Sequence, residues 1–368
     1  MICNSAKMGL IPQRDYFDKD IANSDNTSGY YIIERDDFVY NPRKSSDAPY
    51  GPISRYTYSE AGIVSPLYLC FRAKGNVDSN FFEWYFRSSA WHRYIYMTGD
   101  SGARHDRVSI KDTDFFAMPI RYPSTTEQEK IASFLTAIEE RISSQQLLVD
   151  NLKKYKRGVF EAIFSRKLRL VSKEEQRDWK IFKLSDFASR IIRKNNGTTD
   201  IPLTISAQYG LIDQRDFFSK VVASADMSGY YLLRKGEYAY NRSTSNDYPF
   251  GSIKRLELYD KGAVSTLYLC FSVNENVMVN DFVKWYFESS QWYRSINEIC
   301  AEGARNHGLL NVPTDGFFNT THILPTDTKE QTAIATFLSL IQEKLEISQK
   351  GLNKLTELRN GLMQQLFI

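Results

Sequence analysis

Two stretches of the chain place apolar residues alternately four and three positions apart, with polar residues between them. The first stretch begins at Thr125 and the second at Thr328, and each apolar position of the first has a counterpart 203 residues later. A polar interruption also coincides, because Gln145 corresponds to Ser348. A heptad spacing kept for about five heptads is typical of coiled coils, so each stretch is predicted to be a long helix that pairs with another helix.

The natural partner of each helix is the other one. A second shared interruption, Lys156 with Arg359, lies in the same register. Roughly forty residues at ~1.5 Å each predict a rod of about 60 Å, and an antiparallel pair would carry one globular domain at each end. The alternative is that each helix packs only on its own globular domain. The predicted seam residues are Ile131, Leu135, Ile138, Ile142, Val149, Leu152, Ile334, Leu338, Ile341, Leu345, Leu352 and Leu355.

The segments that precede the helices are also copies of each other. Residues 29–72 laid on 229–272 without a gap are identical at 19 of 44 positions, which marks a duplication. The repeated unit spans about two hundred residues, far more than the ~20–50 of a solenoid repeat, so each copy is a whole domain.

Each copy combines strand and helix patterns. Aromatic and β-branched runs predict strands at 29–33 and 64–71, and at the matching positions of the second copy. A short amphipathic helix is predicted from Asn80 and again from Asn280. We therefore expect α+β domains.

The duplication divides the chain into four predicted segments. They are a first globular domain at 1–123, a first long helix at 124–170, a second globular domain at 171–325 and a second long helix at 326–368. The second domain opens with Trp179 and residues 180–187, for which the first has no counterpart, because Met1 already aligns near Pro202. Either the natural start lies upstream, or the first domain lacks an opening element.

Composition limits the class of protein. The net charge is only +3 over 368 residues, so a nucleic-acid-binding surface has to be local. The N-terminus lacks a signal-peptide layout, and no apolar run is long enough to span a membrane. The cysteines have no CxxC spacing, and Cys70 and Cys270 are equivalent positions in apolar runs, so we expect buried free thiols and a reducing, cytoplasmic setting.

Motifs for catalysis are missing. The sequence contains no phosphate-binding glycine loop, no GxSxG elbow and no HExxH zinc motif. The histidines His92, His105, His307 and His322 show no metal-ligand spacing, and three or four of them are expected to be ordinary surface or loop residues. The chain is therefore predicted to bind rather than catalyse, with no cofactor or metal of its own.

The candidate binding elements are polar loops that occur in both copies. They carry Arg, Lys, Asn, Ser and Thr, which grip phosphates and read base edges, although such residues also favour ordinary turns. The residues that flank 40–47 and 240–247 match between the two copies better than the residues inside these loops. This pattern is expected where a constant backbone carries side chains that recognise different sequences. The candidate DNA contacts are Lys7, Arg14, Asn41, Arg43, Lys44, Ser45, Ser46, Arg55, Arg104, His105, Arg107, Arg215, Asn241, Arg242, Ser243, Thr244, Asn246, Arg255, Arg305, Asn306 and His307.

Two of these assignments have open alternatives. Arg14 and Arg215 each precede an aspartate and are equally compatible with a structural ion pair. The basic stretch at 153–194 is either a solvated helix end with a linker or a surface that faces phosphates.

The layout as a whole resembles the specificity (S) subunit of Type I restriction-modification enzymes. The resemblance rests on the duplicated globule-and-helix unit, on the Glu127-Gln128 and Glu330-Gln331 pairs that open the helices after a proline, and on their similar tails, 154–164 and 357–367. Residues 179–187 are similar to the Trp…Lys-Leu-Gly-Asp that opens domains of that family.

The resemblance implies an α+β fold with two pseudo-twofold-related target recognition domains joined by a long antiparallel two-helix coiled coil. It implies a non-catalytic subunit that binds double-stranded DNA and reads a bipartite site. Two methyltransferase (M) subunits, which use S-adenosylmethionine, would be its partners, and restriction (R) subunits could join them. Because the copies are alike, the two half-sites are expected to be related, nearly inverted sequences.

Two other classes remain open on the sequence. An aromatic-rich, carbohydrate-binding adhesin or tail protein with a coiled-coil stalk would suit the 23 Tyr and 23 Phe residues. A nuclease would need a carboxylate-metal cluster, which the sequence does not display.

Overall fold

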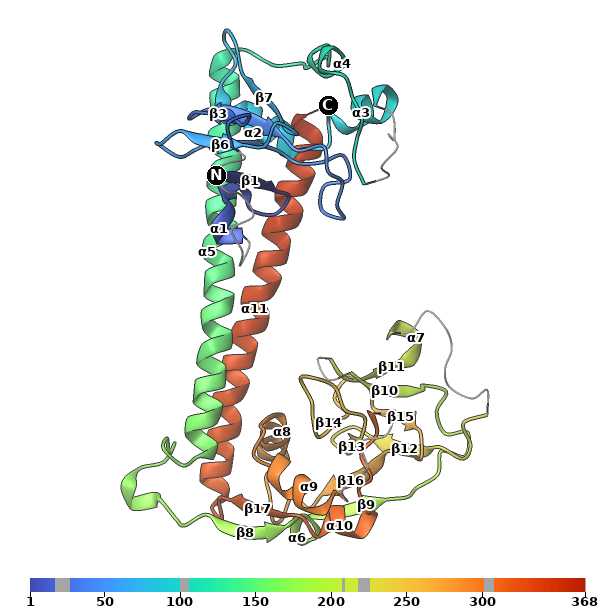
Figure 1. The fold of residues 1–368 in the computed structure, drawn as a ribbon. Coiled ribbons are helices and arrows are strands. Elements are labelled where there is room, and N and C mark those ends of the chain that lie inside the picture. The colour runs from blue at the N-terminus through green and yellow to red at the C-terminus, as the bar shows by residue number, and fades with distance from the viewer. Residues whose placement is uncertain (17–26, 100–105, 207–208, 218–225, 301–307, 368) are drawn as a thin grey trace. The chain divides into compact units, whose positions relative to one another are not determined.

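The computed structural model describes residues 1–16, 27–99, 106–206, 209–217, 226–300 and 308–367 (Figure 1). The chain divides into two compact units: unit 1 comprises Met1–Leu148 and Ser348–Ile368, and unit 2 comprises Val149–Ile347. Both long helices cross this division, so each unit holds one part of each helix. No helix in the described ranges carries an apolar stretch sufficient to span a membrane.

The described strands of unit 1 form small antiparallel sheets. These are β1 (Ile2–Ser5) with β2 (Gly9–Pro12), β3 (Tyr31–Ile33) with β6 (Gly62–Val64), and β4 (Asp37–Tyr40) between β5 (Ile53–Arg55) and β7 (Leu69–Arg72). The helices are α1 (Gln13–Tyr16), α2 (Ser79–Arg87), α3 (His92–Thr98), α4 (Asp112–Phe116) and the long α5 (Thr125–Phe164).

Unit 2 repeats this plan and adds to it. The repeated strands are β10 (Leu203–Ser206) with β11 (Gly210–Asp213), β12 (Tyr231–Arg234) with β15 (Lys261–Val264), and β13 (Tyr238–Asn241) between β14 (Ser252–Arg255) and β16 (Leu269–Val273). The helices are α7 (Gln214–Phe217), α8 (Asn280–Glu288), α9 (Tyr293–Ile299), α10 (Thr314–Phe318) and the long α11 (Thr328–Leu366).

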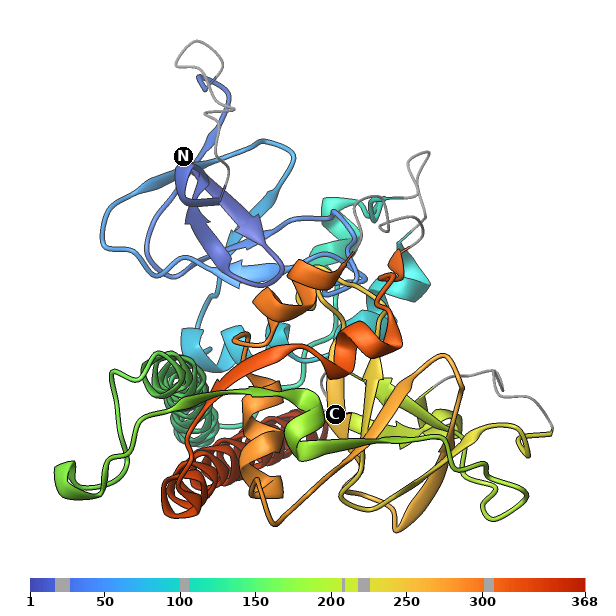
Figure 2. The same ribbon diagram turned by 90° about the horizontal axis from the view of Figure 1, so that it is seen from below.

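The addition is the opening segment of unit 2. After a 3-10 turn at Lys173–Glu175, β8 (Lys180–Lys183) pairs with β17 (Thr321–Leu324), α6 (Leu184–Phe187) follows, and β9 (Ala188–Ile191) joins the free side of β16. Figure 2 shows β8 (green) running alongside β17 (orange-red). The central sheet consequently has four strands in unit 2 and three in the described part of unit 1.

Local sequence patterns account for most of these elements. The strands near residue 30 and the amphipathic helices from Asn80 and Asn280 are confirmed. The single strand predicted at 64–71 is wrong, because β6 and β7 are separated by a turn in which Tyr68 N donates to Ser65 O at 3.1 Å. The second copy has the same turn, with Tyr268 N donating to Ser265 O.

The long helices contact each other in antiparallel register within each unit. In unit 1, Gln145 Nε2 donates to Ser348 O at 2.9 Å, and Arg359 Nη1 donates to Glu139 Oε2 at 2.9 Å. In unit 2, Lys156 Nζ donates to Gln342 Oε1 at 2.7 Å. Since Lys156 and Gln342 are the counterparts of Arg359 and Glu139 at the offset of 203, both units make the same cross-helix contact.

The predicted seam lies along these contacts. Buried seam residues are Leu135, Ile138, Val149, Ile334, Leu338, Ile341 and Leu352, and half-buried ones are Ile131, Ile142, Leu152, Leu345 and Leu355. Each helix also covers its own globule. Trp84 Nε1 donates to Thr136 Oγ1 at 3.1 Å, and its counterpart Trp285 donates to Ser339 Oγ at 3.0 Å.

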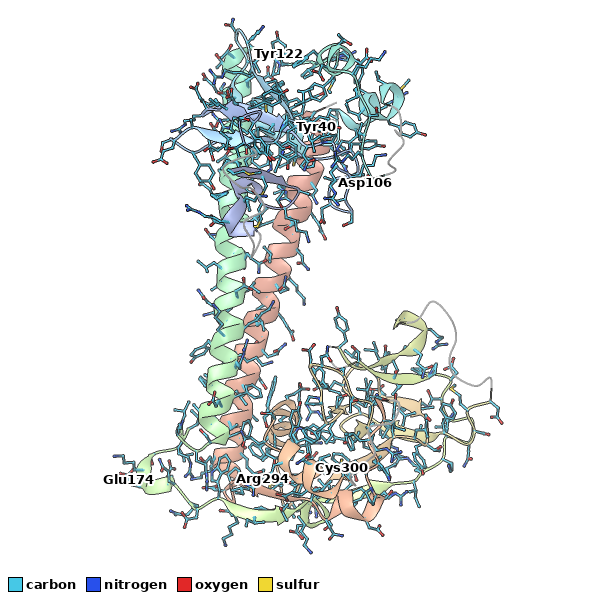
Figure 3. The ribbon with its side chains drawn as sticks, in the orientation of Figure 1. Tyr40, Asp106, Tyr122, Glu174, Arg294 and Cys300 are labelled. Carbon is cyan, nitrogen blue, oxygen red and sulfur yellow. The ribbon has the colours of Figure 1, made fainter. Side chains whose placement is uncertain are left out.

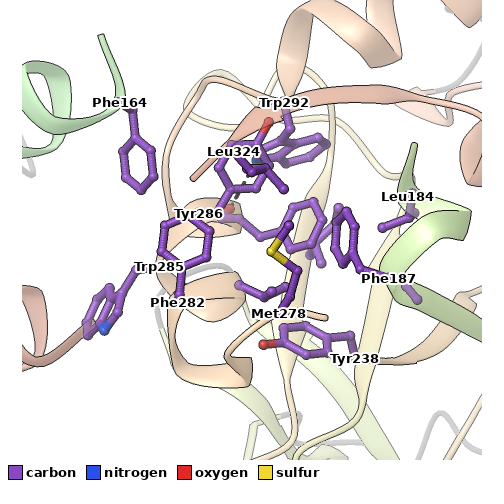
Figure 4. Close-up of a cluster of buried hydrophobic side chains, with 14 of the residues drawn as sticks. Phe164, Leu184, Phe187, Tyr238, Met278, Phe282, Trp285, Tyr286, Trp292 and Leu324 are labelled. Atoms are coloured by element: carbon purple, nitrogen blue, oxygen red, sulfur yellow. Dashed lines mark hydrogen bonds between the residues drawn. The ribbon is translucent and has the colours of Figure 1, made fainter. Parts of the chain in front are cut away.

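Aromatic side chains dominate the core of each unit. In unit 2, Phe164 of α5 packs on Phe282 and Tyr286 of α8, and Phe187 of α6 lies on the other side of the same cluster (Figure 4). In unit 1, Phe367 takes the place of Phe164 and packs on Phe81 and Tyr85.

One histidine lies in the core. His322 is buried, and its ring lies between Tyr286 and Thr320, with Nδ1 and Nε2 each 2.9 Å from a hydroxyl oxygen. The pattern missed it because β17 is a short strand whose inward face is set by its pairing with β8. Burial lowers the pKa of His322 to about 4.

Candidate nucleic-acid interface

A polar loop follows the central strand in each unit and is held by the same backbone bonds. In unit 1, Asn41 Oδ1 accepts from Arg43 N at 3.1 Å, Lys44 N donates to Asp106 O at 2.8 Å, and Val108 N donates to Pro42 O at 2.9 Å. The loop 41–47 is thereby fixed beside residues 106–108.

The second unit repeats these bonds with different residues. Asn241 Oδ1 accepts from Ser243 N at 3.0 Å, Thr244 N donates to Gly308 O at 2.7 Å, and Leu310 N donates to Arg242 O at 3.0 Å. Isolated bridges link Arg43 to Arg107 and Ser243 to Leu309. The sequence of exposed and half-buried positions is identical in 41–50 and 241–250.

A glycine anchors the far end of each loop. Gly51 and Gly251 adopt φ angles of +82° and +77°, and a Cβ at either position would collide with the carbonyl oxygen of Asn41 or Asn241. Below the loop, Tyr40 and Tyr240 donate hydroxyl hydrogen bonds to the carbonyls of Tyr50 and Phe250, each at 2.8 Å. Figure 3 shows Tyr40 within the body of unit 1 and Asp106 at its margin. The same hydrogen-bonded loop frame therefore carries different side chains in the two units.

In unit 1, several positively charged side chains lie close together at the loop. Lys7, Arg43, Lys44 and Arg107 line one open pocket of about 590 Å³, together with Asn4 and other polar groups. Lys7 and Arg43 are exposed, with loose ion pairs to Asp47 at 3.5 Å and Asp106 at 3.9 Å. Such pairs are worth little in water and exchange readily for phosphate contacts.

Unit 2 presents a less basic loop. Ser243 and Asn246 are exposed and Thr244 is half-buried. Arg242 donates from Nη2 to Leu267 O at 3.1 Å, and its Nε is buried without a hydrogen-bond partner among the described atoms. The same holds for the Nε of Arg107.

Other predicted contacts are held by carboxylates. Arg55 donates to Asp36 and Glu83 at 3.1 and 2.9 Å, and Arg255 donates to Asp281 and Glu257, each at 2.8 Å. Both arginines tie a strand to the following helix, so this geometry favours a structural role.

The Arg-Asp pairs differ between the units. Arg215 donates to both oxygens of Asp213, and these hydrogen bonds lower the pKa of that carboxyl. Arg14 is largely exposed, and its Nε lies 3.9 Å from Asp15 Oδ1.

The remaining predicted contacts fall into two groups. Asn41, Ser45 and Ser46 belong to the unit 1 loop and Asn241 to the unit 2 loop, whereas Arg104, His105, Arg305, Asn306 and His307 lie outside the described residues.

Several cations of the basic stretch at 153–194 also have structural partners. Arg169 Nη2 donates at 2.7 Å to Glu330, a buried carboxylate that also accepts from Trp179 Nε1. Arg193 donates to Glu237 at 2.6 Å, and Lys194 to the carbonyl of Gly229 at 2.8 Å.

Asn4, which no sequence pattern indicated, braces the unit 1 loop. It donates to Val39 O at 2.7 Å, accepts from Ser54 Oγ at 2.8 Å, and its carbonyl accepts from Asn41 Nδ2 at 3.1 Å. The register of the hairpins puts Ile205 at the equivalent position of unit 2, so the comparison of repeats gave no signal. Within the described ranges, no group of three His, Cys, Asp or Glu residues is arranged to hold a metal ion.

Solved structures with the same fold are Type I restriction-modification S subunits. The chain aligns with an HsdS subunit from Thermoanaerobacter tengcongensis at TM-score 0.50 and 14% identity, covering 91% of this chain and 81% of that one. It aligns with a Type I S subunit from M. genitalium at TM-score 0.52 and 15% identity, covering 95% and 87%.

A third match belongs to a structure that addresses complex assembly and conformational transition of the type I R-M system, at TM-score 0.51 and 14% identity over 91% of this chain and 82% of that one. No protein-family model matches the chain, and no curated protein matches it by sequence. The resemblance predicted from the sequence is thus confirmed at the level of the fold, an HsdS-like α+β fold with long helices at 125–164 and at the C-terminus.

Proposed function

We propose that this chain is a DNA-specificity subunit of a Type I restriction-modification system. The observation that carries the proposal is the loop frame found once in each unit, with the same backbone bonds and different exposed side chains. A frame that is kept while its side chains change is what a pair of readers for two different DNA segments requires. The fold shared with S subunits supports the same conclusion.

The contacts would divide between positioning and reading. The exposed Lys7 and the half-buried Lys44 would bind phosphates, while Arg43 and the side chains at 242–246 would meet base edges in a groove. The two target recognition domains, 1–123 and 171–325, would each bind one half of a bipartite site on double-stranded DNA.

The long helices would fix the distance between the half-sites. We propose that they form one antiparallel coiled coil with pseudo-twofold-related domains at its ends, supported by the matching cross-helix contacts of Arg359 and Lys156. A pseudo-twofold relation would present the half-sites as related, inverted sequences. Differences between the halves would arise where the loops differ, at 42–44 and 46 in unit 1 and at 242–244 and 246 in unit 2.

The chemistry would belong to partner subunits. Two methyltransferase subunits that carry S-adenosylmethionine would methylate adenine in each half, restriction subunits could complete the assembly, and this chain would bind no cofactor. The setting would be the cytoplasm.

The test is a methylome. The chain is co-expressed with a Type I methyltransferase subunit from its own organism, in a host that lacks adenine methylation, and modified sites are mapped by long-read sequencing. The proposal predicts a single bipartite motif with an unread spacer of constant length. Methylation without such a motif, or a purified chain that is not retained on duplex DNA in a salt-dependent manner, would contradict it.

A further inference from the structure

The loops of the two units share a backbone frame but carry different charges. At the unit 1 loop, four cations lie near two carboxylates: Lys7, Arg43, Lys44 and Arg107, with Asp47 and Asp106. The carboxylates offset only half of the positive charge, so an excess of two positive charges remains around one open pocket.

The same positions of unit 2 are uncharged. In the same order, the counterparts of the four unit 1 cations are Gln208, Ser243, Thr244 and Leu309. Within the sequence 241–247, Arg242 is balanced by Asp247. The Arg242 guanidinium also donates to the carbonyl oxygens of Leu267 and Val312, at 3.1 and 3.4 Å, which ties it to the protein.

The unit 1 cations are available to a ligand. Within the described ranges, the side chains of Lys44 and Arg107 make no hydrogen bond or ion pair. Burial raises the pKa of the Tyr68 hydroxyl, and the positive charges of Arg107 and Arg43 oppose that rise, so both guanidinium groups lie near this hydroxyl. A half-buried guanidinium without a counter-charge favours the binding of an anion.

The accessibility of the two loops does not differ. Exposed and half-buried positions follow one another in the same order in 41–50 and 241–250. A ligand can therefore approach both loops in the same way, and only the charge that it meets is different.

We infer that the unit 1 pocket is an anion site for phosphates of the DNA backbone, and that unit 1 supplies most of the salt-dependent affinity for DNA. The unit 2 loop contributes little to this part of the affinity. The inference rests on the proposed function and deepens it, because two like domains would by themselves be expected to contribute equally. Each phosphate that a cation neutralises releases counterions, so the dependence of binding on salt counts these contacts.

The test measures the affinity of the full chain for a fluorescent duplex of mixed sequence, between about 50 and 200 mM salt. Lys7→Gln combined with Lys44→Thr gives unit 1 the residues of unit 2 at two of the four positions. The slope of log affinity against log salt should become less negative by about two, since each lost phosphate contact is worth about 0.9. The converse variant, Ser243→Arg with Thr244→Lys, should make the slope steeper by a similar amount.

Two exposed lysines of unit 1 that do not line the pocket, Lys74 and Lys111, provide the matched control. Lys74→Gln combined with Lys111→Gln should change the slope by less than about half a unit. An equal change in this control would overturn the inference, because the total charge rather than the pocket would then set the slope.

The remaining outcomes separate the inference from the proposed function. If the parent chain binds the duplex but Lys7→Gln with Lys44→Thr leaves the slope unchanged, the assignment of the phosphate site to unit 1 is wrong and the proposed function stands. If the parent chain does not bind the duplex at all, the proposed function is contradicted, and this inference with it.

Discussion

Gln145 and Ser348 correspond to each other in the two copies, and they also touch: Gln145 Nε2 donates to Ser348 O at 2.9 Å. Equivalent residues meet in this way where two copies of a helix cross in antiparallel register. Polar residues at a seam position cost stability but specify register, which explains why the heptad pattern is interrupted at the same point in both copies.

Glu139 forms an ion pair across the two long helices in unit 1. It accepts from Arg359 at 2.9 Å and from Arg87 at 3.0 Å. Glu139→Gln should lower the free energy of unfolding by about 1–3 kcal/mol, because two guanidinium groups lose their counter-charge. Urea denaturation checks this, with the exposed neighbour Glu140→Gln as a control that should change stability by less than about 0.5 kcal/mol.

The same carboxylate gives a dependence on pH. Burial alone would raise the pKa of Glu139, but the hydrogen bond from Arg359 and the charges of Arg87 and Arg359 lower it below its ordinary value of 4.5. Its stabilising effect is therefore full above pH 4.5 and is lost as the pH falls through the lowered pKa. Equal acid sensitivity of the parent and Glu139→Gln would contradict this.

His322 should make unit 2 sensitive to mild acid. Thr320 Oγ1 donates to Phe317 O, so Nε2 of His322 donates to Thr320 Oγ1 and Nδ1 accepts from the Tyr286 hydroxyl, which fixes the neutral ring. Protonation of Nδ1 would turn it into a donor, so it could no longer accept the hydrogen bond from the Tyr286 hydroxyl. Because burial lowers the pKa from 6.5 to about 4, the unfolded state takes up the proton first.

Stability should consequently fall as the pH drops from 6.5 towards 4, by about 2–3 kcal/mol in total. Urea unfolding between these pH values measures it. His322→Gln should flatten the dependence, and His92→Gln, at a half-buried ring, should leave most of it. If the unfolding free energy of His322→Gln falls with pH as steeply as that of the parent, another group is responsible.

Gly51 is required by the loop frame of unit 1. Gly51→Ala should destabilise the chain by about 2–4 kcal/mol, since the methyl group would meet the carbonyl of Asn41 in addition to the strain of a positive φ. Gly75→Ala is the matched control, because Gly75 also has a positive φ (+68°) and no atom near the added carbon. Denaturation curves should rank Gly51→Ala well below Gly75→Ala, and equal effects would mean that the close approach to Asn41 does not matter.

The sequence predicted what depends on local periodicity and on the duplication. The starts of the long helices at Thr125 and Thr328 follow from heptads and flanking prolines, and the amphipathic helices follow from their spacing. Contacts between distant segments were not accessible in this way. The carboxylates that hold Arg55 come from other elements, and the burial of His322 depends on a strand more than a hundred residues away. Asn4 has no polar counterpart in unit 2, so the repeat could not reveal it.

If the paired helices set the spacer, lengthening them should lengthen it. One heptad added to both helices, beside Gln145 and Ser348, amounts to about 10 Å, or about three base pairs at ~3.4 Å each. The methylome should show unchanged half-sites with a longer spacer. A heptad added to one helix only should instead break the register between the helices and lower stability. An unaltered spacer after insertion into both helices would show that helix length does not set the spacer.

The exchange of the loop side chains tests the central claim most directly. Because the two frames share their backbone bonds, unit 1 can be given the unit 2 side chains by combining Pro42→Arg, Arg43→Ser, Lys44→Thr and Ser46→Asn. We predict that the methylome motif then changes in one half only, towards the sequence of the other half, with the spacer and the second half unchanged. A motif that is identical before and after the exchange would contradict the account.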